Sequence, residues 1–239
     1  MANYINKGNR RFAPSLDDEY VDKTGLIAEI NATLFKEKRF TCVSRCRRFG
    51  KSMAAKMLCA YYDKSCDSRE MFRGLEIENH PSFEKHLNKY PVIYVDMTNF
   101  VTKYHGERSI VDVIQRTLID DISEVYADVA VKESDDLMDY LLRVASATGE
   151  QFFFIIDEWD AICRELENNK DAMGEYVNLL RRMFKSADAA DVFAGVYMTG
   201  ILPIKKYQTE SALNNFREYS MIDPKGLARY FGFTREGVR

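Results

Sequence analysis

The sequence predicts an α/β fold in which helices flank a parallel sheet. Nearly continuous apolar runs lie at residues 91–97, 151–156 and 192–198, as expected of buried parallel strands, and a short β-rich run lies at residues 39–44. Stretches with apolar residues at helical spacing lie between several of them, and strands separated by helices favour a parallel sheet. Three of the runs end in polar motifs, and ligands of such sheets bind beyond the carboxyl ends of the strands. These ends are alternatively ordinary loops, although three chemically suitable loops together disfavour that reading.

The elements of the first half are expected in the following order. Residues 1–36 form a mixed polar segment that leads into the core, with one helical pattern at Leu26, Ile27, Ile30 and Leu34. A short β-rich run at 39–44 meets the stretch RCRRFGKS, and a helix is expected over 53–62. A loop-rich region then leads to the strand at 91–97.

In the second half, apolar stripes predict helices within 110–125, 137–145 and 173–184. The most hydrophobic strand, 151–156, ends in Asp157-Glu158, and the strand at 192–198 ends in Thr199-Gly200. A last short strand is expected at 219–222. We therefore divide the chain into the N-terminal segment, a core domain over 37–223 and a C-terminal piece over 224–239.

Composition excludes several classes of protein. The 239 residues are 46% hydrophobic and 30% charged, enough to build a core without disulfides. A net charge of −3 gives no bulk electrostatic reason to bind nucleic acid or a membrane. Five scattered cysteines and three histidines do not resemble a disulfide framework or a zinc site. No apolar run can span a bilayer and no signal peptide is evident, so we expect a cytoplasmic protein.

The stretch at 45–52 matches the phosphate-loop pattern GxxxxGK[ST], except that Arg45 replaces the first glycine. Gly50 lets the backbone approach a phosphate, Lys51 reaches the β- and γ-phosphates, and the Ser52 hydroxyl binds Mg²⁺. The alternative is a basic turn with a chance GKS tripeptide. The expected nucleotide contacts are Arg47, Arg48, Phe49, Gly50, Lys51, Ser52 and Met53.

An apolar strand that ends in Asp157-Glu158 has the form of a Walker B motif. Asp157 would hold Mg²⁺ and Glu158 would act as general base, unless these residues only begin a loop or cap a helix. The GKS loop about 105 residues upstream favours the first interpretation. Thr199 is a candidate sensor of the γ-phosphate, or else simply a threonine at a strand end.

The sequence resembles the AAA-ATPase-like proteins of bacteria and archaea over nearly its whole length. The matching pieces are residues 20–24, 45–52, 90–94, 155–160, 199–204, 214–216, 223–224 and 230–234. That family has RPRRFGKS at the phosphate loop, so Arg45 is a family feature and Cys46 is the departure. Trp159 stands where tyrosine is more usual. Neither change affects an expected ligand.

The resemblance implies a P-loop NTPase of the additional-strand class, with sheet order 5-1-4-3-2 and ATP rather than GTP as ligand. Relatives continue into a helical lid and a nuclease domain. We expect only the start of the lid at 224–239 and no nuclease site, because only Asp223-Pro224-Lys225 fits (D/E)-x-K. This tail should be mobile, or it should dock on the core domain or on another chain, which would be a second copy or a partner. Its apolar residues are Leu227, Tyr230, Phe231 and Phe233.

Two classes of function follow. The preferred one is Mg²⁺-dependent ATP hydrolysis with Glu158, Lys51 and Thr199 as catalytic residues. The other is a non-hydrolysing nucleotide switch or interaction module, a fragment of a longer ATPase–nuclease protein. Glu158 favours the enzyme and the missing lid favours the switch. Nucleic acid enters only by analogy with nuclease-linked relatives.

The roles of several cations stay open. Arg47 and Arg48 either clamp the nucleotide or lie in solvent. Arg217 is either an arginine finger for a neighbouring subunit or a surface ion-pair residue. Lys205 and Lys206 either contact nucleic acid or belong to a solvated loop.

Four uncharged residues have two readings as well. Tyr20 and Val21 either pack on adenine or belong to the core. Cys42 and Cys46 either provide redox control or are small buried hydrophobic residues.

Overall fold

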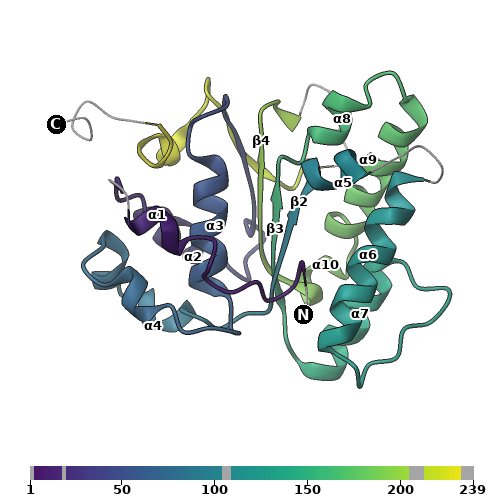
Figure 1. Cartoon of the computed structure of the whole chain (residues 1–239), viewed down its shortest axis with the longest axis horizontal. Helices are drawn as coiled ribbons and strands as arrows, with labels where there is room; N and C mark the ends of the chain where they lie inside the picture. The colour runs from purple at the N-terminus through teal and green to yellow at the C-terminus, as the bar shows by residue number, and fades with distance from the viewer. Residues whose placement is uncertain (1–2, 18–19, 104–108, 205–212, 233–239) are drawn as a thin grey trace.

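One parallel sheet lies between two layers of helices in the computed structural model, which describes residues 3–17, 20–103, 109–204 and 213–232 (Figure 1). The spatial order β2-β3-β4-β1-β5 is the predicted order 5-1-4-3-2 read from the other edge. All four strand pairings are parallel. The strands are β1 (Phe40–Ser44), β2 (Val92–Asp96), β3 (Phe152–Asp157), β4 (Phe193–Gly200) and β5 (Arg217–Tyr219).

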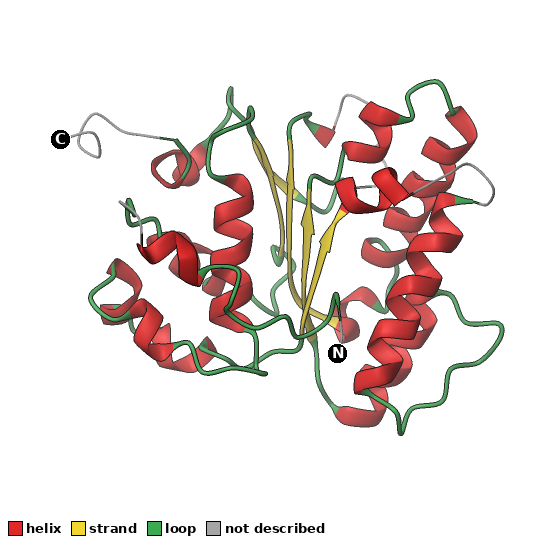
Figure 2. Cartoon of the chain, viewed as in Figure 1, coloured by secondary structure: helices red, strands yellow, loops and turns green. Residues whose placement is uncertain are grey.

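Helices cover both faces of the sheet (Figure 2). One layer contains α1 (Ala13–Asp17), α2 (Gly25–Asn31), α3 (Lys51–Tyr62) and α4 (Phe83–His86), with the short 3-10 turns η1 (Arg69–Phe72), η2 (Glu76–Asn79) and η4 (Lys225–Tyr230). The other contains α5 (Met97–Lys103), α6 (Ile110–Val125), α7 (Leu137–Thr148), α8 (Ala161–Glu165), α9 (Lys170–Phe184) and α10 (Ala189–Val192). Every residue of β3 and β4 is buried, because each face of the sheet has its own apolar core.

Two expected elements have different bounds. α2 ends at Asn31, and Phe35 then has a φ of 62°, so Leu34 lies in the turn after the helix. The last strand is Arg217–Tyr219 rather than 219–222, because its ladder pairs Tyr219 with Val43 near the end of β1. Ile222, which was expected inside the strand, is 97% exposed.

The polar N-terminal segment adds to the free edge of β2. Ile5 forms an antiparallel bridge with Ile93, and the Tyr94 N–H donates to the Tyr4 carbonyl at 2.8 Å. Asp121 on α6 fixes the segment, since its buried carboxylate accepts three successive backbone N–H groups, at 2.5, 2.8 and 3.0 Å. The polar composition of the segment did not indicate that it extends the sheet edge, because the segment is held mainly by hydrogen bonds of its backbone.

Replacing Asp121 with alanine should destabilise the fold. The substitution leaves three N–H groups without their charged acceptor, and a hydrogen bond to a charged group contributes about 1.5–3 kcal/mol. Urea unfolding should show a loss of free energy of unfolding in this range. Asp120→Ala removes an exposed carboxylate from the same helix and should cost little. Equal stabilities of the two variants would contradict this role.

The topology brings the three polar motifs to one rim of the sheet. β4 lies between β1 and β3, and Thr199 on β4 pairs with Val43 on β1. β1, β3 and β4 therefore end side by side, at Ser44, Asp157 and Gly200. Among the residues that the structure describes, none of the helices has both the length and the hydrophobicity of a membrane span.

Candidate functional site

The loop at residues 45–50, called here the Gly50 loop, connects β1 to α3. Gly50 has a φ of 79° and Arg48 a φ of 69°, so the loop makes two left-handed steps before the helix begins. A β-carbon on Gly50 would meet nothing within 4 Å, so the backbone conformation, not space, requires glycine. In the described part of the chain no side chain caps α3, which leaves its first N–H groups free for an anion.

Arg45, at the first position of the pattern, turns into the protein. Its side chain is buried, and Nη1 donates to the Tyr219 carbonyl on β5 at 3.2 Å. Its backbone N–H donates to the Gly200 carbonyl at 3.0 Å, and its guanidinium lies 5.9 Å from the centre of the Phe231 ring. Arginine therefore stands here because it joins the start of the loop to β4, β5 and the C-terminal turn.

The Lys51 side chain is only 4% exposed. Its Nζ donates to the Cys46 carbonyl at 3.1 Å and lies 3.5 Å from Glu158 Oε1. The next residue, Ser52, is half-buried in the first turn of α3, and Phe49 is half-buried in the loop. The other expected contacts of this stretch, Arg47, Arg48 and Met53, are exposed.

Asp157 lies at the end of β3 with both carboxylate oxygens hydrogen-bonded. The Thr199 hydroxyl donates to Oδ1 at 2.5 Å, and the Tyr94 hydroxyl on β2 donates to Oδ2 at 3.0 Å. Burial and the nearby Asp157 carboxylate raise the pKa of Tyr94, so this phenol remains a donor. Sequence reasoning missed Tyr94, although a tyrosine inside an otherwise apolar strand was a signal that its hydroxyl needs a partner.

Glu158 follows directly and has a φ of 54°. Its N–H donates to Thr199 Oγ1 at 3.2 Å, while its carboxylate lies between Lys51 Nζ and Arg164 Nη2, at 3.5 and 2.7 Å. Burial raises the pKa of Glu158, and the neighbouring carboxylates add to this, whereas the two cations oppose it. The structure thus brings Lys51, Asp157, Glu158 and Thr199 together, and adds Arg164, which no motif indicated.

Gly200 is required for the packing of this rim. A β-carbon there would lie 2.5 Å from Trp159 Nε1 and 2.9 Å from Asp160 Oδ1, both in the turn after β3. Gly200→Ala should lower the free energy of unfolding by about 1–3 kcal/mol, as overpacking does. Gly174→Ala on α9 meets nothing within 4 Å and should be neutral or slightly stabilising. Thermal unfolding of both variants checks this, and unchanged stability of Gly200→Ala would contradict the contact.

A cavity of about 550 Å³ lies beside the Gly50 loop. The N-terminal segment forms one wall, α3 and the loop form another, and the C-terminal turn contributes a third. That turn is docked, because the Gly232 N–H donates to the Phe49 carbonyl at 3.2 Å and Leu227, Tyr230 and Phe231 are buried. The lining includes Arg11, Tyr20, Val21, Arg48, Phe49, Met53 and Tyr230.

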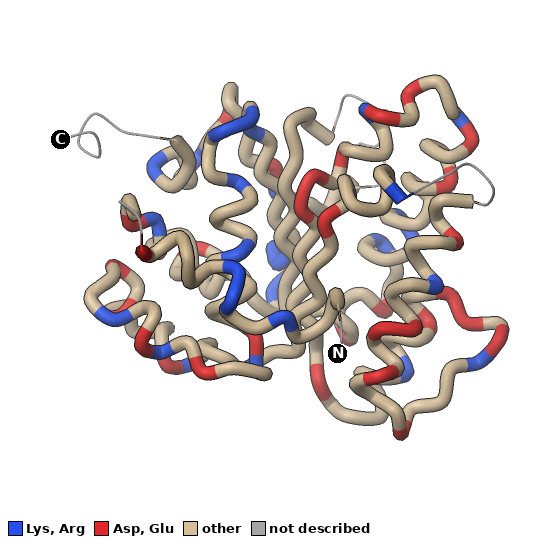
Figure 3. The backbone as a smooth tube through the Cα atoms, viewed as in Figure 1, with Lys and Arg blue, Asp and Glu red and all other residues tan. Residues whose placement is uncertain are grey.

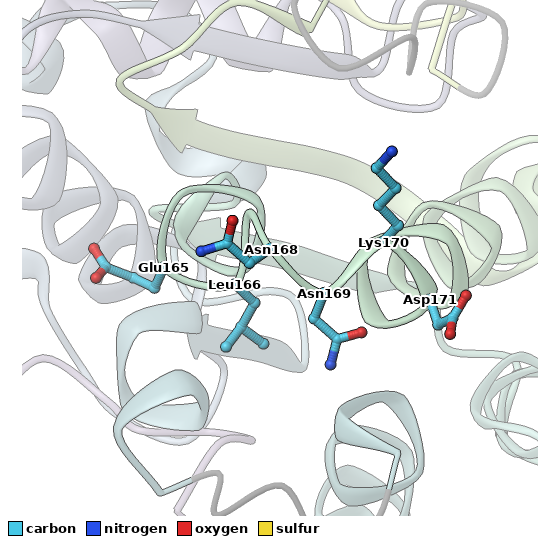
Figure 4. Close-up of a pocket in the computed structure, with 6 residues that line it drawn as sticks. All are labelled: Glu165, Leu166, Asn168, Asn169, Lys170 and Asp171. Carbon is cyan, nitrogen blue, oxygen red and sulfur yellow. The ribbon is translucent and has the colours of Figure 1, made fainter.

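Another hollow, of about 590 Å³, lies at the turn between α8 and α9 (Figure 4). Its lining comes entirely from the consecutive stretch 165–171, so it is a surface concavity without converging elements.

Figure 3 shows basic residues along the N-terminal segment and the Gly50 loop, and acidic residues at the nearby end of β3. The charges of the rim therefore suit an anion together with a cation.

A family model described as "Predicted AAA-ATPase" matches residues 15–209. The chain belongs to the AAA-ATPase-like family. The match covers the Gly50 loop, the Asp157-Glu158 pair and Thr199, so the expected membership is confirmed. No curated protein matches the chain.

Several open alternatives can now be compared with their surroundings. Cys42 is buried, and desolvation raises the pKa of its thiol, whereas Cys46 is exposed on the loop and is not a core residue. Arg217 lies 5.4 Å from the Tyr219 ring within β5. Lys205 and Lys206 lie outside the described residues, as does Phe233.

Proposed function

We propose that this AAA-ATPase-like chain binds ATP with Mg²⁺ and hydrolyses it. The observation that carries the proposal is the short distance between Lys51 and Glu158. The two motifs lie more than a hundred residues apart in the chain, as 158 minus 51 is 107, yet Nζ and Oε1 are 3.5 Å apart. A lysine that can bind phosphate beside a carboxylate that can act as general base is an arrangement suited to phosphoryl transfer to water.

In this proposal the Gly50 loop binds the triphosphate. The N–H groups at the start of α3 face the phosphates, and Lys51 exchanges its contacts with Cys46 and Glu158 for the β- and γ-phosphates. Arg47 and Arg48 are exposed where they can approach the phosphates. Backbone donors and one buried lysine suit a polyanion, so the residues present fit the ligand.

The Ser52 hydroxyl and the Asp157 carboxylate would hold Mg²⁺, the latter through water. Both are hard oxygen donors, which Mg²⁺ prefers, and each oxygen of Asp157 keeps a lone pair beyond its one hydrogen bond. Mg²⁺ would neutralise charge that develops on the phosphates. Thr199 would orient Asp157 and lie close to the attacking water.

The cavity beside the loop is the proposed site for the nucleobase. Its volume falls in the range of small-ligand pockets, and Tyr20, Val21 and Met53 supply apolar surface for a planar base. Tyr20 packs edge-on against Phe12 at 5.7 Å, which fixes its ring. The choice of adenine over guanine rests on the family.

A non-hydrolysing nucleotide switch is the second candidate. It is favoured by the ion pairs of Glu158, whose two carboxylate oxygens each lie near a cation. A carboxylate held in this way cannot accept a proton from water until one cation leaves. The two candidates share the binding step and differ in turnover.

Titration with ATP, with and without Mg²⁺, followed by measurement of phosphate release, tests the proposal. We expect saturable binding that Mg²⁺ strengthens, and slow phosphate release that requires the metal. Binding without any release would support the switch. Absence of binding in both conditions would overturn both candidates.

A further inference from the structure

Arg164 on α8 lies beside the proposed site and belongs to neither motif. Its side chain is 16% exposed, Nη2 lies 2.7 Å from Glu158 Oε2, and Nε lies 3.1 Å from Asp160 Oδ2. The planar guanidinium therefore bridges two carboxylates that follow β3, and Nη1 also lies 3.7 Å from the exposed Glu165 carboxylate. A planar guanidinium fixes the orientation of the carboxylates that it binds and also supplies a positive charge. A lysine at this position would supply the charge without fixing the orientation.

Asp160 fixes the guanidinium in place. It is fully buried, and its Oδ2 accepts the N–H groups of Ile201 and Leu202 at 3.2 and 2.9 Å. These donors belong to the backbone directly after β4. Arg164 is thereby held at a constant position relative to the rim that carries Thr199, and it is not an adjustable surface ion pair.

The two oxygens of Glu158 have different surroundings. Oε1 faces Lys51 at 3.5 Å, on the side of the Gly50 loop, and Oε2 faces Arg164. When Lys51 turns to a bound triphosphate, Oε1 loses its cation while Oε2 keeps Arg164. The oxygen freed in this way would be Oε1, the one on the side of the Gly50 loop.

We propose that Arg164 is a positioning residue for Glu158: it holds Oε2, so that Oε1 faces the nucleotide once Lys51 has left. This inference rests on the proposed function. It implies that Arg164 also weakens the hold of Glu158 on Lys51, because the carboxylate is shared between the two cations. Without Arg164, Glu158 would pair more strongly with Lys51 and compete with the nucleotide.

The test compares Arg164→Ala and Arg164→Gln with the wild-type chain. Two quantities are measured: the Kd of a non-hydrolysable ATP analogue with Mg²⁺, and the kcat and KM for ATP. We expect the Kd to rise about threefold to tenfold and kcat to fall about tenfold or more. Changes of this size are typical of neighbouring charged residues that are energetically coupled. The glutamine side chain is uncharged and has an NH2 group that can donate to Asp160, so this variant serves if the alanine variant does not fold.

A double-substitution cycle separates positioning from a structural role. In a Glu158→Gln background the neutral amide no longer competes for Lys51, so adding Arg164→Ala should leave the Kd unchanged. Arg143→Ala is the matched control, because it removes a bidentate pair with Asp135, at 2.6 Å for each contact, on a helix that contributes nothing to the proposed site. Thermal unfolding of all variants accounts for changes in stability.

Each result has a definite meaning. Wild-type Kd and kcat in Arg164→Ala, or a rise in Kd that persists undiminished beside Glu158→Gln, would overturn the role of Arg164 and leave ATP binding intact. If the wild-type chain binds the analogue without hydrolysing ATP, the Kd cycle alone decides. If it binds no nucleotide, the proposed function fails and this inference fails with it.

Discussion

Glu158→Gln should abolish most ATP turnover while ATP still binds. The amide keeps the size of the carboxylate but cannot accept a proton from water, and a general base contributes roughly 10²–10⁴ in rate. We expect kcat to fall within this range. Because Lys51 would no longer be paired with a charge, the Kd for ATP should be equal to that of the wild-type chain or lower.

The measurement is steady-state phosphate release together with the Kd of ATP. Glu150→Gln is the matched control. Glu150 lies just before the start of β3, whereas Glu158 follows its end, and it pairs with Lys64 and Tyr126 away from the rim. Retained turnover in Glu158→Gln would remove Glu158 from the mechanism. A parallel loss in Glu150→Gln would instead point to a general effect on folding.

Lys51→Ala should weaken ATP binding by roughly 10- to 150-fold, the equivalent of about 1.5–3 kcal/mol for a charge-assisted hydrogen bond. The Lys51 ammonium group is almost fully buried beside the Gly50 loop. A cation from the solvent therefore cannot easily take its place in the alanine variant. Turnover should fall further, because the charge on the γ-phosphate is no longer balanced.

Calorimetric titration of both chains gives the two Kd values, and Lys85→Ala on α4 is the control. Lys85 is an exposed lysine on a helix away from the loop, so its loss should leave the Kd unchanged. Equal affinity for ATP in the wild-type chain and Lys51→Ala would remove the Gly50 loop from the binding site.

The sequence allowed the sheet to be predicted because its strands are buried on both faces. Continuous apolar runs such as FFFII mark β3 without ambiguity, and the family pattern supplied the strand order. The edge elements were harder to predict. β5 has only three residues, and its bounds depend on pairing with β1, which no local pattern records.

The candidate site divides in the same way. Gly50, Lys51, Asp157, Glu158 and Thr199 were found because their spacing is typical of a known chemistry. Other contacts were not indicated by any motif. The inward turn of Arg45 and the hydrogen bond of Tyr94 join distant elements, and no periodicity in the sequence indicates them. The bridge made by Arg164 reaches residues four and six positions before it, but it lies outside both motifs.

A crystal structure with a non-hydrolysable ATP analogue and Mg²⁺ tests the central claim most directly. We expect the triphosphate on the Gly50 loop, with Lys51 Nζ moved from Glu158 to the phosphates, Mg²⁺ at Ser52 and Asp157, and the base in the cavity beside Tyr20. An analogue bound elsewhere, or an ordered Gly50 loop without nucleotide at saturating concentration, would contradict it.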